Sequence, residues 1–110
     1  SISPLRTAML YNAVANNGVM VKPYLVNSIV EDGKTIKAFT PTVVKEKICS
    51  QATLQQLKTC LEGVCINGTG KSLFAKAAYA AAGKTGTALV SDGKVTYADK
   101  VYQSSFAGYF

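Results

Sequence analysis

Two Asp-Gly pairs, each set among strand-forming residues, restrict most strongly what this chain can fold into. Asp32-Gly33 lies inside segment 19–39, and Asp92-Gly93 separates the residues after Gly83 from segments 95–97 and 101–110. An Asp-Gly pair between such runs is typical of a tight hairpin turn. The sequence therefore predicts two antiparallel hairpins. The strand formers of the first are Tyr24, Leu25, Val26, Ile29, Val30, Thr35 and Ile36.

Two further stretches carry helix signals. Ser3-Pro4 combines a capping hydroxyl with a first-turn proline, and Asn17-Gly18 is suited to end the helix that follows. Ser50 is a second cap, and the apolar residues after it recur at helical spacing, which predicts a helix over about 51–64. Segment 67–70 must be a loop, and the alanine-rich segment 71–82 is expected to be partly helical.

Composition removes several classes of function. The chain has 110 residues, enough for one small domain or a part of a larger one, and a net charge of +6. The basic residues are scattered without interleaved aromatic residues, so nucleic-acid binding is not expected. Histidine is absent and the three cysteines match no zinc or redox spacing, so we expect no metal or cofactor and interpret the cysteines as small buried hydrophobic residues. No apolar run approaches the roughly 20 residues that span a bilayer.

The stretch AAGKTGTALV, residues 81–90, has two incompatible interpretations. Gly83-Lys84-Thr85 could end a phosphate-binding loop, but that loop requires glycine where this chain has Ala78, and it leads into a helix. Here Gly86 and strand formers follow. Gly70-Lys71-Ser72 fails in the same way, with Cys65 at the glycine position. Neither stretch matches the phosphate loop, so nucleotide binding is disfavoured.

The same stretch makes chemical sense as a strand. Lys84 supplies a positive charge, the hydroxyl of Thr85 can hold a carboxylate, and Gly86 leaves room for a ligand. The amide of Thr87 can point at a developing oxyanion if the strand lies along a cleft. These are parts of an acyl-transfer site without a nucleophile. Because Lys84 and Thr85 should face opposite sides of a sheet, both can serve one ligand only if the strand meets the cleft edge-on. The alternative is an ordinary threonine-rich edge strand with a solvated lysine.

Further motifs accompany this strand in a fixed order. They are Ser3-Pro4-Leu5, Asn16-Asn17-Gly18, Lys22-Pro23-Tyr24-Leu25-Val26, Gly68-Thr69-Gly70, Ala82-Gly83-Lys84-Thr85-Gly86-Thr87-Ala88 and Ser105-Phe106-Ala107-Gly108-Tyr109-Phe110. The series resembles the C-terminal half of the transpeptidase domain of class B penicillin-binding proteins, and it covers nearly the whole chain. The resemblance implies an α+β fold, a fragment of the β-lactamase/transpeptidase-like fold with an antiparallel sheet flanked by helices. It also implies an enzyme that cross-links peptidoglycan stem peptides and is acylated by β-lactams.

The resemblance also implies roles for particular residues. Lys84 would be the catalytic lysine of the cleft that supports proton transfer, and Thr85 and Thr87 would bind the carboxylate of substrate or β-lactam. The amide of Thr87 would form half of the oxyanion hole, and Gly86 would keep the strand approachable. The loop 68–70 would be structural. The resemblance implies neither a cofactor nor a metal.

The chain departs from the family in its nucleophile. The family's acylating serine lies in S-x-x-K at a helix start, whereas the one match here, Ser91-Asp92-Gly93-Lys94, follows the KTGT strand in a turn and is interpreted as chance. The S-x-N element is missing. We therefore expect residues 1–110 to be the C-terminal portion of a transpeptidase domain truncated at both ends, inert without the serine.

Three more expectations concern the parent protein and its partners. The parent is expected on the periplasmic side of the bacterial inner membrane, anchored by an N-terminal helix, with stem peptides and β-lactams as its partners. A non-enzymatic β-lactam-sensing or cell-wall-binding module of the same fold is the alternative. The isolated chain is expected to associate with itself through the long, weakly charged strand 101–110.

Overall fold

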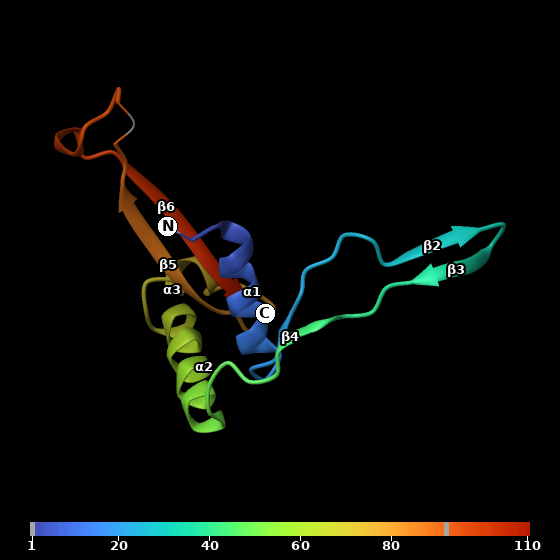
Figure 1. Ribbon diagram of the computed structural model, residues 1–110. Helices are drawn as coiled ribbons and strands as arrows, with labels where there is room; N and C mark the ends of the chain where they lie inside the picture. The colour runs from blue at the N-terminus through green and yellow to red at the C-terminus, as the bar shows by residue number, and fades with distance from the viewer. Residues whose placement is uncertain (1, 92) are drawn as a thin grey trace. The chain divides into compact units, whose positions relative to one another are not determined.

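A computed structural model describes residues 2–91 and 93–110 (Figure 1). The chain divides into two compact units, Ser1–Leu54 and Gln55–Phe110. Within the described residues, helices and strands are interspersed along the chain, and every strand pairing is antiparallel, in three two-stranded sheets. This mixture confirms the expected α+β class.

The first unit begins with α1, Pro4–Ala15, as the capping signals predict. The hydroxyl of Ser3 accepts a hydrogen bond from the amide of Arg6 at 3.4 Å. Asn17 and Gly18 then adopt positive φ values of 53° and 86°, which turn the chain out of the helix. Ala13 and Val14 are buried.

Two small sheets follow in this unit. β1, Met20–Val21, pairs with β4, Val43–Lys45, a pairing too short for the sequence pattern to indicate. β2, Ser28–Glu31, pairs with β3, Lys34–Ala38, around a turn in which Asp32 and Gly33 have φ values of 49° and 73°. Positive φ at both positions is the signature of a type I′ turn, so the first hairpin is confirmed.

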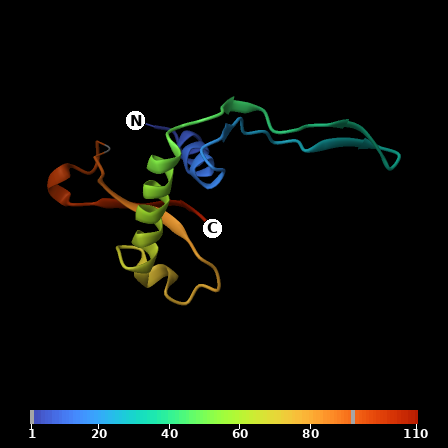
Figure 2. The same cartoon turned by 90° about the horizontal axis from the view of Figure 1, so that it is seen from below.

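The first hairpin is shorter than its strand formers suggest. Tyr24, Leu25 and Val26 lie outside any strand, so their assignment to the hairpin is wrong. Leu25 is fully exposed, and strand propensity largely reflects packing against neighbours, which is missing here. β2 and β3 are exposed at every residue and run side by side as a narrow two-stranded arm (Figures 1 and 2).

The helix α2, Gln51–Ile66, confirms the second predicted helix and extends it by two residues. The hydroxyl of Ser50 caps it, accepting from the amide of Thr53 at 3.2 Å. The prediction that all the cysteines are buried is wrong in part. Cys65 is buried, but Cys49, which lies before the helix, is half-buried, and Cys60 is exposed because only part of the helix surface is covered.

The second unit continues with α3, Lys71–Phe74, which is the only helical part of the alanine-rich segment 71–82 in the described chain. β5, Ala82–Leu89, and β6, Tyr102–Tyr109, then form the second hairpin. Its connection is longer than a tight turn, and in Figure 1 it projects beyond the paired strands.

Segment 95–97 is not a strand, contrary to prediction. Tyr97 begins a short 3-10 helix, Tyr97–Asp99, because the carboxylate of Asp99 accepts hydrogen bonds from the Thr96 amide at 2.7 Å and the Thr96 hydroxyl at 2.9 Å. The predicted turn at Asp92-Gly93 falls partly outside the described residues, since only Gly93, with φ of 84°, is described.

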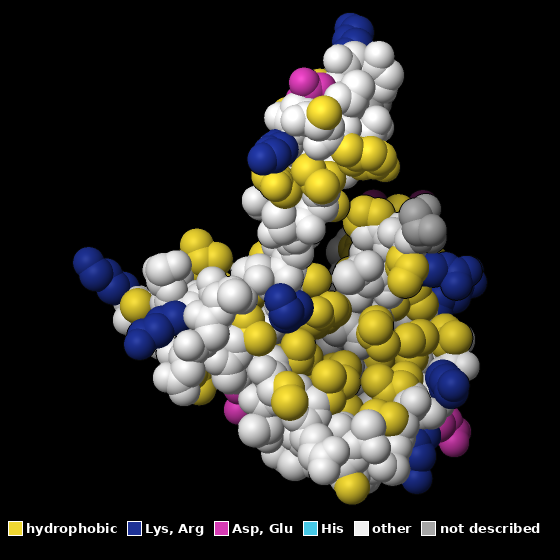
Figure 3. Space-filling model, turned by 90° about the vertical axis from the view of Figure 1, so that its left-hand side faces the viewer, with side chains coloured by type: hydrophobic (Ala, Val, Ile, Leu, Met, Phe, Trp, Pro, Cys, Tyr) yellow, Lys and Arg dark blue, Asp and Glu magenta, His cyan; other side chains and the backbone are white. Residues whose placement is uncertain are grey.

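Surface features add little to this architecture. On the face shown in Figure 3, lysine and arginine side chains are scattered among apolar ones. Within residues 2–91 and 93–110, three or more potential metal ligands never cluster. The helices of this part of the chain also lack the length and apolarity needed to cross a membrane.

Candidate functional site

The register of β5 and β6 decides which backbone groups of the KTGT strand are free. The amide of Val90 donates to the carbonyl of Val101 at 2.9 Å, and the pairing continues residue for residue from Leu89 opposite Tyr102. Hydrogen-bonded and non-hydrogen-bonded pairs alternate in an antiparallel ladder. Thr85 and Thr87 therefore belong to non-hydrogen-bonded pairs, and their N–H and C=O groups point away from β6.

That direction is open within the described chain, where β5 pairs only with β6. Lys84 and Thr87 are exposed, whereas Thr85 and Gly86 are half-buried. Thr85 and Thr87 lie two residues apart, so their side chains share one face of the strand. Two hydroxyls on one face of β5 thus lie beside two outward-facing amides on its free edge.

The lysine reaches this edge in spite of the alternation of side chains. Lys84 Nζ donates to the carbonyl oxygen of Thr85 at 2.8 Å and to its Oγ1 at 3.3 Å. Its flexible four-carbon stem lets the ammonium group curl around the strand from the opposite face. The edge therefore combines a positive charge with hydroxyl and amide donors, which suits an anionic ligand.

Gly86 leaves room for the side chain of its cross-strand neighbour. It pairs with Ser105, and a β-carbon on Gly86 would lie 2.5 Å from Ser105 Oγ. Gly83 is more tightly enclosed, because a β-carbon there would collide with the Phe106 ring and lie 2.5 Å from the carbonyl oxygen of Ala107. Both glycines thus permit the close pairing of β5 with β6.

Thr69 is the residue that sequence reasoning missed. Its Oγ1 lies 2.8 Å from Oγ1 of Thr85, so the loop 68–70 contributes a polar contact in addition to its structural role. A hydroxyl-bearing residue between two glycines is the only signal in the sequence, and it carries no information about this partner. The pairing depends on the tertiary fold of the second unit.

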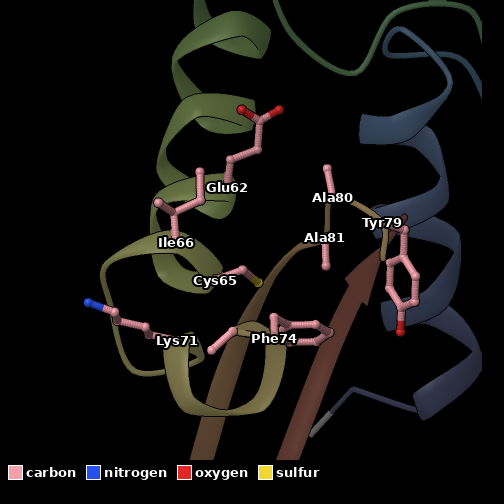
Figure 4. A pocket seen from close by; sticks show the side chains of 9 residues that line it. Glu62, Cys65, Ile66, Lys71, Phe74, Tyr79, Ala80 and Ala81 are labelled. Atoms are coloured by element: carbon pink, nitrogen blue, oxygen red, sulfur yellow. The ribbon is translucent and has the colours of Figure 1, made fainter. Parts of the chain in front are cut away.

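A separate pocket of about 360 Å³ lies between α2, α3 and the segment before β5 (Figure 4). Cys65 of α2 and Phe74 of α3 contribute to its largely apolar wall. Figure 4 shows the ammonium group of Lys71 extending outward. Phe74 also packs against Phe106 of β6, with ring centroids 5.3 Å apart. We therefore interpret the pocket as a gap in the packing between these elements. It lacks the set of hydrogen-bond donors found on β5.

Ser91, the serine of the S-x-x-K match, lies in the connection between β5 and β6 and is exposed. This position is not a helix start, which agrees with interpreting the match as chance. Lys84 and Thr85 lie inside a strand, whereas a phosphate loop would place them at the N-terminus of a helix.

Two groups near the strand pair have perturbed acidities. Burial raises the pKa of Tyr109, and the negative charge of Glu62 raises it further. The Tyr109 hydroxyl is buried without a hydrogen-bond partner among the described residues. The Thr96 amide, followed by the Thr96 hydroxyl, lowers the pKa of Asp99.

Comparisons with known proteins agree on one family. The model of the penicillin binding protein transpeptidase domain matches residues 1–110. Stage V sporulation protein D of Bacillus subtilis (strain 168) is 33% identical over 112 residues, which cover 99% of this chain and 17% of that protein. A peptidoglycan D,D-transpeptidase FtsI homolog of Mesostigma viride is 31% identical over 123 residues, covering 100% of this chain and 20% of that protein.

Solved structures show the same likeness. The D,D-transpeptidase domain of a peptidoglycan glycosyltransferase from Eggerthella lenta matches with a TM-score of 0.72 and 35% identity, over 92% of this chain and 22% of that one. Penicillin-binding protein 2B from Streptococcus pneumoniae (strain R6) matches in fold with a TM-score of 0.75 at 23% identity, over 96% of this chain and 20% of that one. The chain thus spans about a fifth of the length of these relatives.

Proposed function

This chain belongs to the penicillin-binding protein transpeptidase domain family, and on that premise we propose that it forms part of a peptidoglycan D,D-transpeptidase. The parent protein would cross-link stem peptides through an acyl-serine and would be acylated by β-lactams. Residues 1–110 would contribute one wall of its cleft. The small share of each relative that the chain covers supports the view that further segments complete the site.

The edge of β5 supplies the binding half of this reaction. A ligand carboxylate would accept hydrogen bonds from the hydroxyls of Thr85 and Thr87, and Lys84 would balance its charge. The outward amide of Thr87 would donate to the oxyanion that develops when serine attacks the acyl carbon. In that step a C–O bond forms to serine, the scissile C–N bond breaks, and the proton that the serine hydroxyl loses ends on the leaving amine.

The observation that carries this proposal is the contact of Lys84 Nζ with Thr85. It brings the cation, a hydroxyl and the free amides of the strand to the same edge, where the alternation of side chains alone would separate them. The lysine of an ordinary edge strand would extend away from the strand, whereas the exposed Lys84 side chain folds back onto Thr85. This geometry therefore favours a ligand-binding strand.

The test is labelling with a fluorescent penicillin. We expect the full-length parent protein to form a label that survives denaturation, and the 110-residue chain alone to form none, because the serine lies elsewhere in the parent. A stable label on the isolated chain would refute the proposed division of the site. If the folded parent protein is not labelled, the proposed transpeptidase activity is refuted.

A β-lactam sensor or cell-wall-binding module of the same fold is the second candidate. It would keep the edge of β5 and would differ in the serine-bearing elements of the parent. If the parent binds stem peptides but releases no D-alanine from them, the module is favoured.

We also propose a location and a mode of association. The parent would work on the periplasmic side of the inner membrane, where peptidoglycan is assembled. The isolated chain would self-associate through β6, because this strand carries no charged residue and pairs only with β5 in the described chain. Light scattering at high concentration should give a mass above that of the monomer, and a monomeric mass would contradict the association.

A further inference from the structure

The contact between Thr69 and Thr85 joins the loop after α2 to the candidate binding edge. The two hydroxyl oxygens are 2.8 Å apart, and either can be the donor. Lys84 Nζ donates to the same Thr85 oxygen at 3.3 Å. Thr85 Oγ1 therefore has two polar neighbours within the second unit before any ligand binds.

The direction of the hydrogen bond between the Thr69 and Thr85 hydroxyls decides whether the Thr85 hydrogen is available to a ligand. A hydroxyl has one donor hydrogen and two acceptor lone pairs. If Thr69 donates, both lone pairs of Thr85 are occupied, one by Thr69 and one by Lys84, and its hydrogen is left for a ligand. If Thr85 donates to Thr69, that hydrogen is used. A carboxylate only accepts hydrogen bonds, so it selects the first arrangement.

The loop that carries Thr69 is held firmly against the end of α2. The amide of Gly68 donates to the carbonyl of Gly63, and that of Gly70 to the carbonyl of Val64, each at 2.9 Å. A β-carbon on Gly68 would lie only 2.9 Å from the Cα of Val64. The backbone on both sides of Thr69 is thus fixed by close contact with the helix, which restricts where its hydroxyl can lie.

We propose that Thr69 is a positioning residue that donates to Thr85 and directs the Thr85 hydroxyl hydrogen toward the carboxylate of the ligand. This role rests on the proposed function of the β5 edge. A donor and a cation on the same oxygen also polarise the Thr85 hydroxyl, so that it donates more strongly. The loop between the two glycines would then set the orientation of a binding group on β5 without touching the ligand.

The experiment measures the second-order rate constant for acylation of the full-length protein by benzylpenicillin. Thr69→Val removes the hydroxyl at nearly constant volume, and Thr69→Ala does so if valine disturbs the loop. Thr69→Ser retains the donor. The matched control is Thr59→Val on α2, which breaks only a hydrogen bond to the carbonyl of Gln55 at 3.0 Å. Melting temperatures establish that each variant is folded.

We expect Thr69→Val to lower the acylation rate by about threefold to tenfold, the range set by one ordinary hydrogen bond. Thr69→Ser and Thr59→Val should react like the unsubstituted protein. The loss should vanish with the methyl ester of benzylpenicillin, because the ester lacks the carboxylate. Since Thr69 acts through Thr85, adding Thr69→Val to Thr85→Val should change nothing further.

Two results would overturn the inference. The first is an unchanged rate in folded Thr69→Val and Thr69→Ala, and the second is a loss that multiplies with that of Thr85→Val. In both cases the unsubstituted protein is still labelled normally. If the unsubstituted protein is not labelled at all, the proposed function is refuted, and the role of Thr69 is refuted with it.

Discussion

Gly83→Ala tests the close pairing of β5 with β6. The new methyl group would collide with the Phe106 ring and lie 2.5 Å from the carbonyl oxygen of Ala107 and 2.9 Å from the Cα of Gly108. Ordinary contacts of this kind lie near 3.5 Å, so the strands must separate by about 1 Å. Because two of these neighbours are backbone atoms, rotating a side chain cannot relieve the strain.

Overpacking of this kind costs about 1–3 kcal/mol. The free energy of unfolding, measured by urea denaturation of the protein that contains this chain, should fall by that amount. Gly63→Ala is the matched control, since a β-carbon there meets nothing within 4 Å and the residue lies inside α2. Alanine in a helix interior should stabilise by about 0.5–1 kcal/mol.

Gly86→Ala separates backbone strain from side-chain strain. Its β-carbon would lie 2.5 Å from Ser105 Oγ, which can rotate away. We expect a smaller loss than for Gly83→Ala, and Ser105→Ala should remove it. If Gly83→Ala is as stable as Gly63→Ala, the tight pairing derived for β5 and β6 is wrong.

Three further predictions concern capping and acidity. Ser50→Ala removes the α2 cap and should cost about 0.5–2 kcal/mol of unfolding free energy, whereas Ser50→Asp should retain most of it. Because the pKa of Tyr109 is raised, the stability it contributes is present below its ordinary pKa of about 10 and is lost as pH rises through the folded value. Glu62→Gln should lower that pKa in an NMR titration of labelled tyrosine, and an unchanged value would count against the assignment. Because the pKa of Asp99 is lowered, the stability that this carboxylate contributes is present above its ordinary pKa near 4 and is lost as pH falls further. Thr96→Val should raise that pKa only part-way in a carbon-13 NMR titration, because the backbone amide still donates to Asp99.

Local signals in the sequence were sufficient for elements whose stabilising contacts are themselves local. The Ser3 and Ser50 hydroxyls cap the next turn of backbone, and Asp32-Gly33 adopts the positive φ values that its residues tolerate. The β1–β4 pairing could not be predicted, because it joins strands of two and three residues across an intervening hairpin. Segment 95–97 was misassigned because the hydrogen bonds from Thr96 to the Asp99 carboxylate outweigh strand propensity.

The candidate site, too, was only partly predictable from the sequence. The sequence indicated the residue types on β5, but it left open whether the strand meets a cleft edge-on or is an ordinary threonine-rich edge strand. It did not indicate how Lys84 reaches Thr85, because that contact depends on the curl of a flexible side chain. Nor did it indicate Thr69, whose partner is 16 residues away. The roles of Lys84, Thr85, Gly86 and Thr87 in catalysis and binding stay predictions.

A crystal structure of the full-length protein acylated by benzylpenicillin tests the central claim most directly. We predict a covalent bond to a serine outside residues 1–110, a ligand carboxylate within hydrogen-bond distance of the Thr85 and Thr87 hydroxyls, and the acyl oxygen facing the amide of Thr87. A ligand attached to Ser91, or one bound without contact to the edge of β5, would contradict the account.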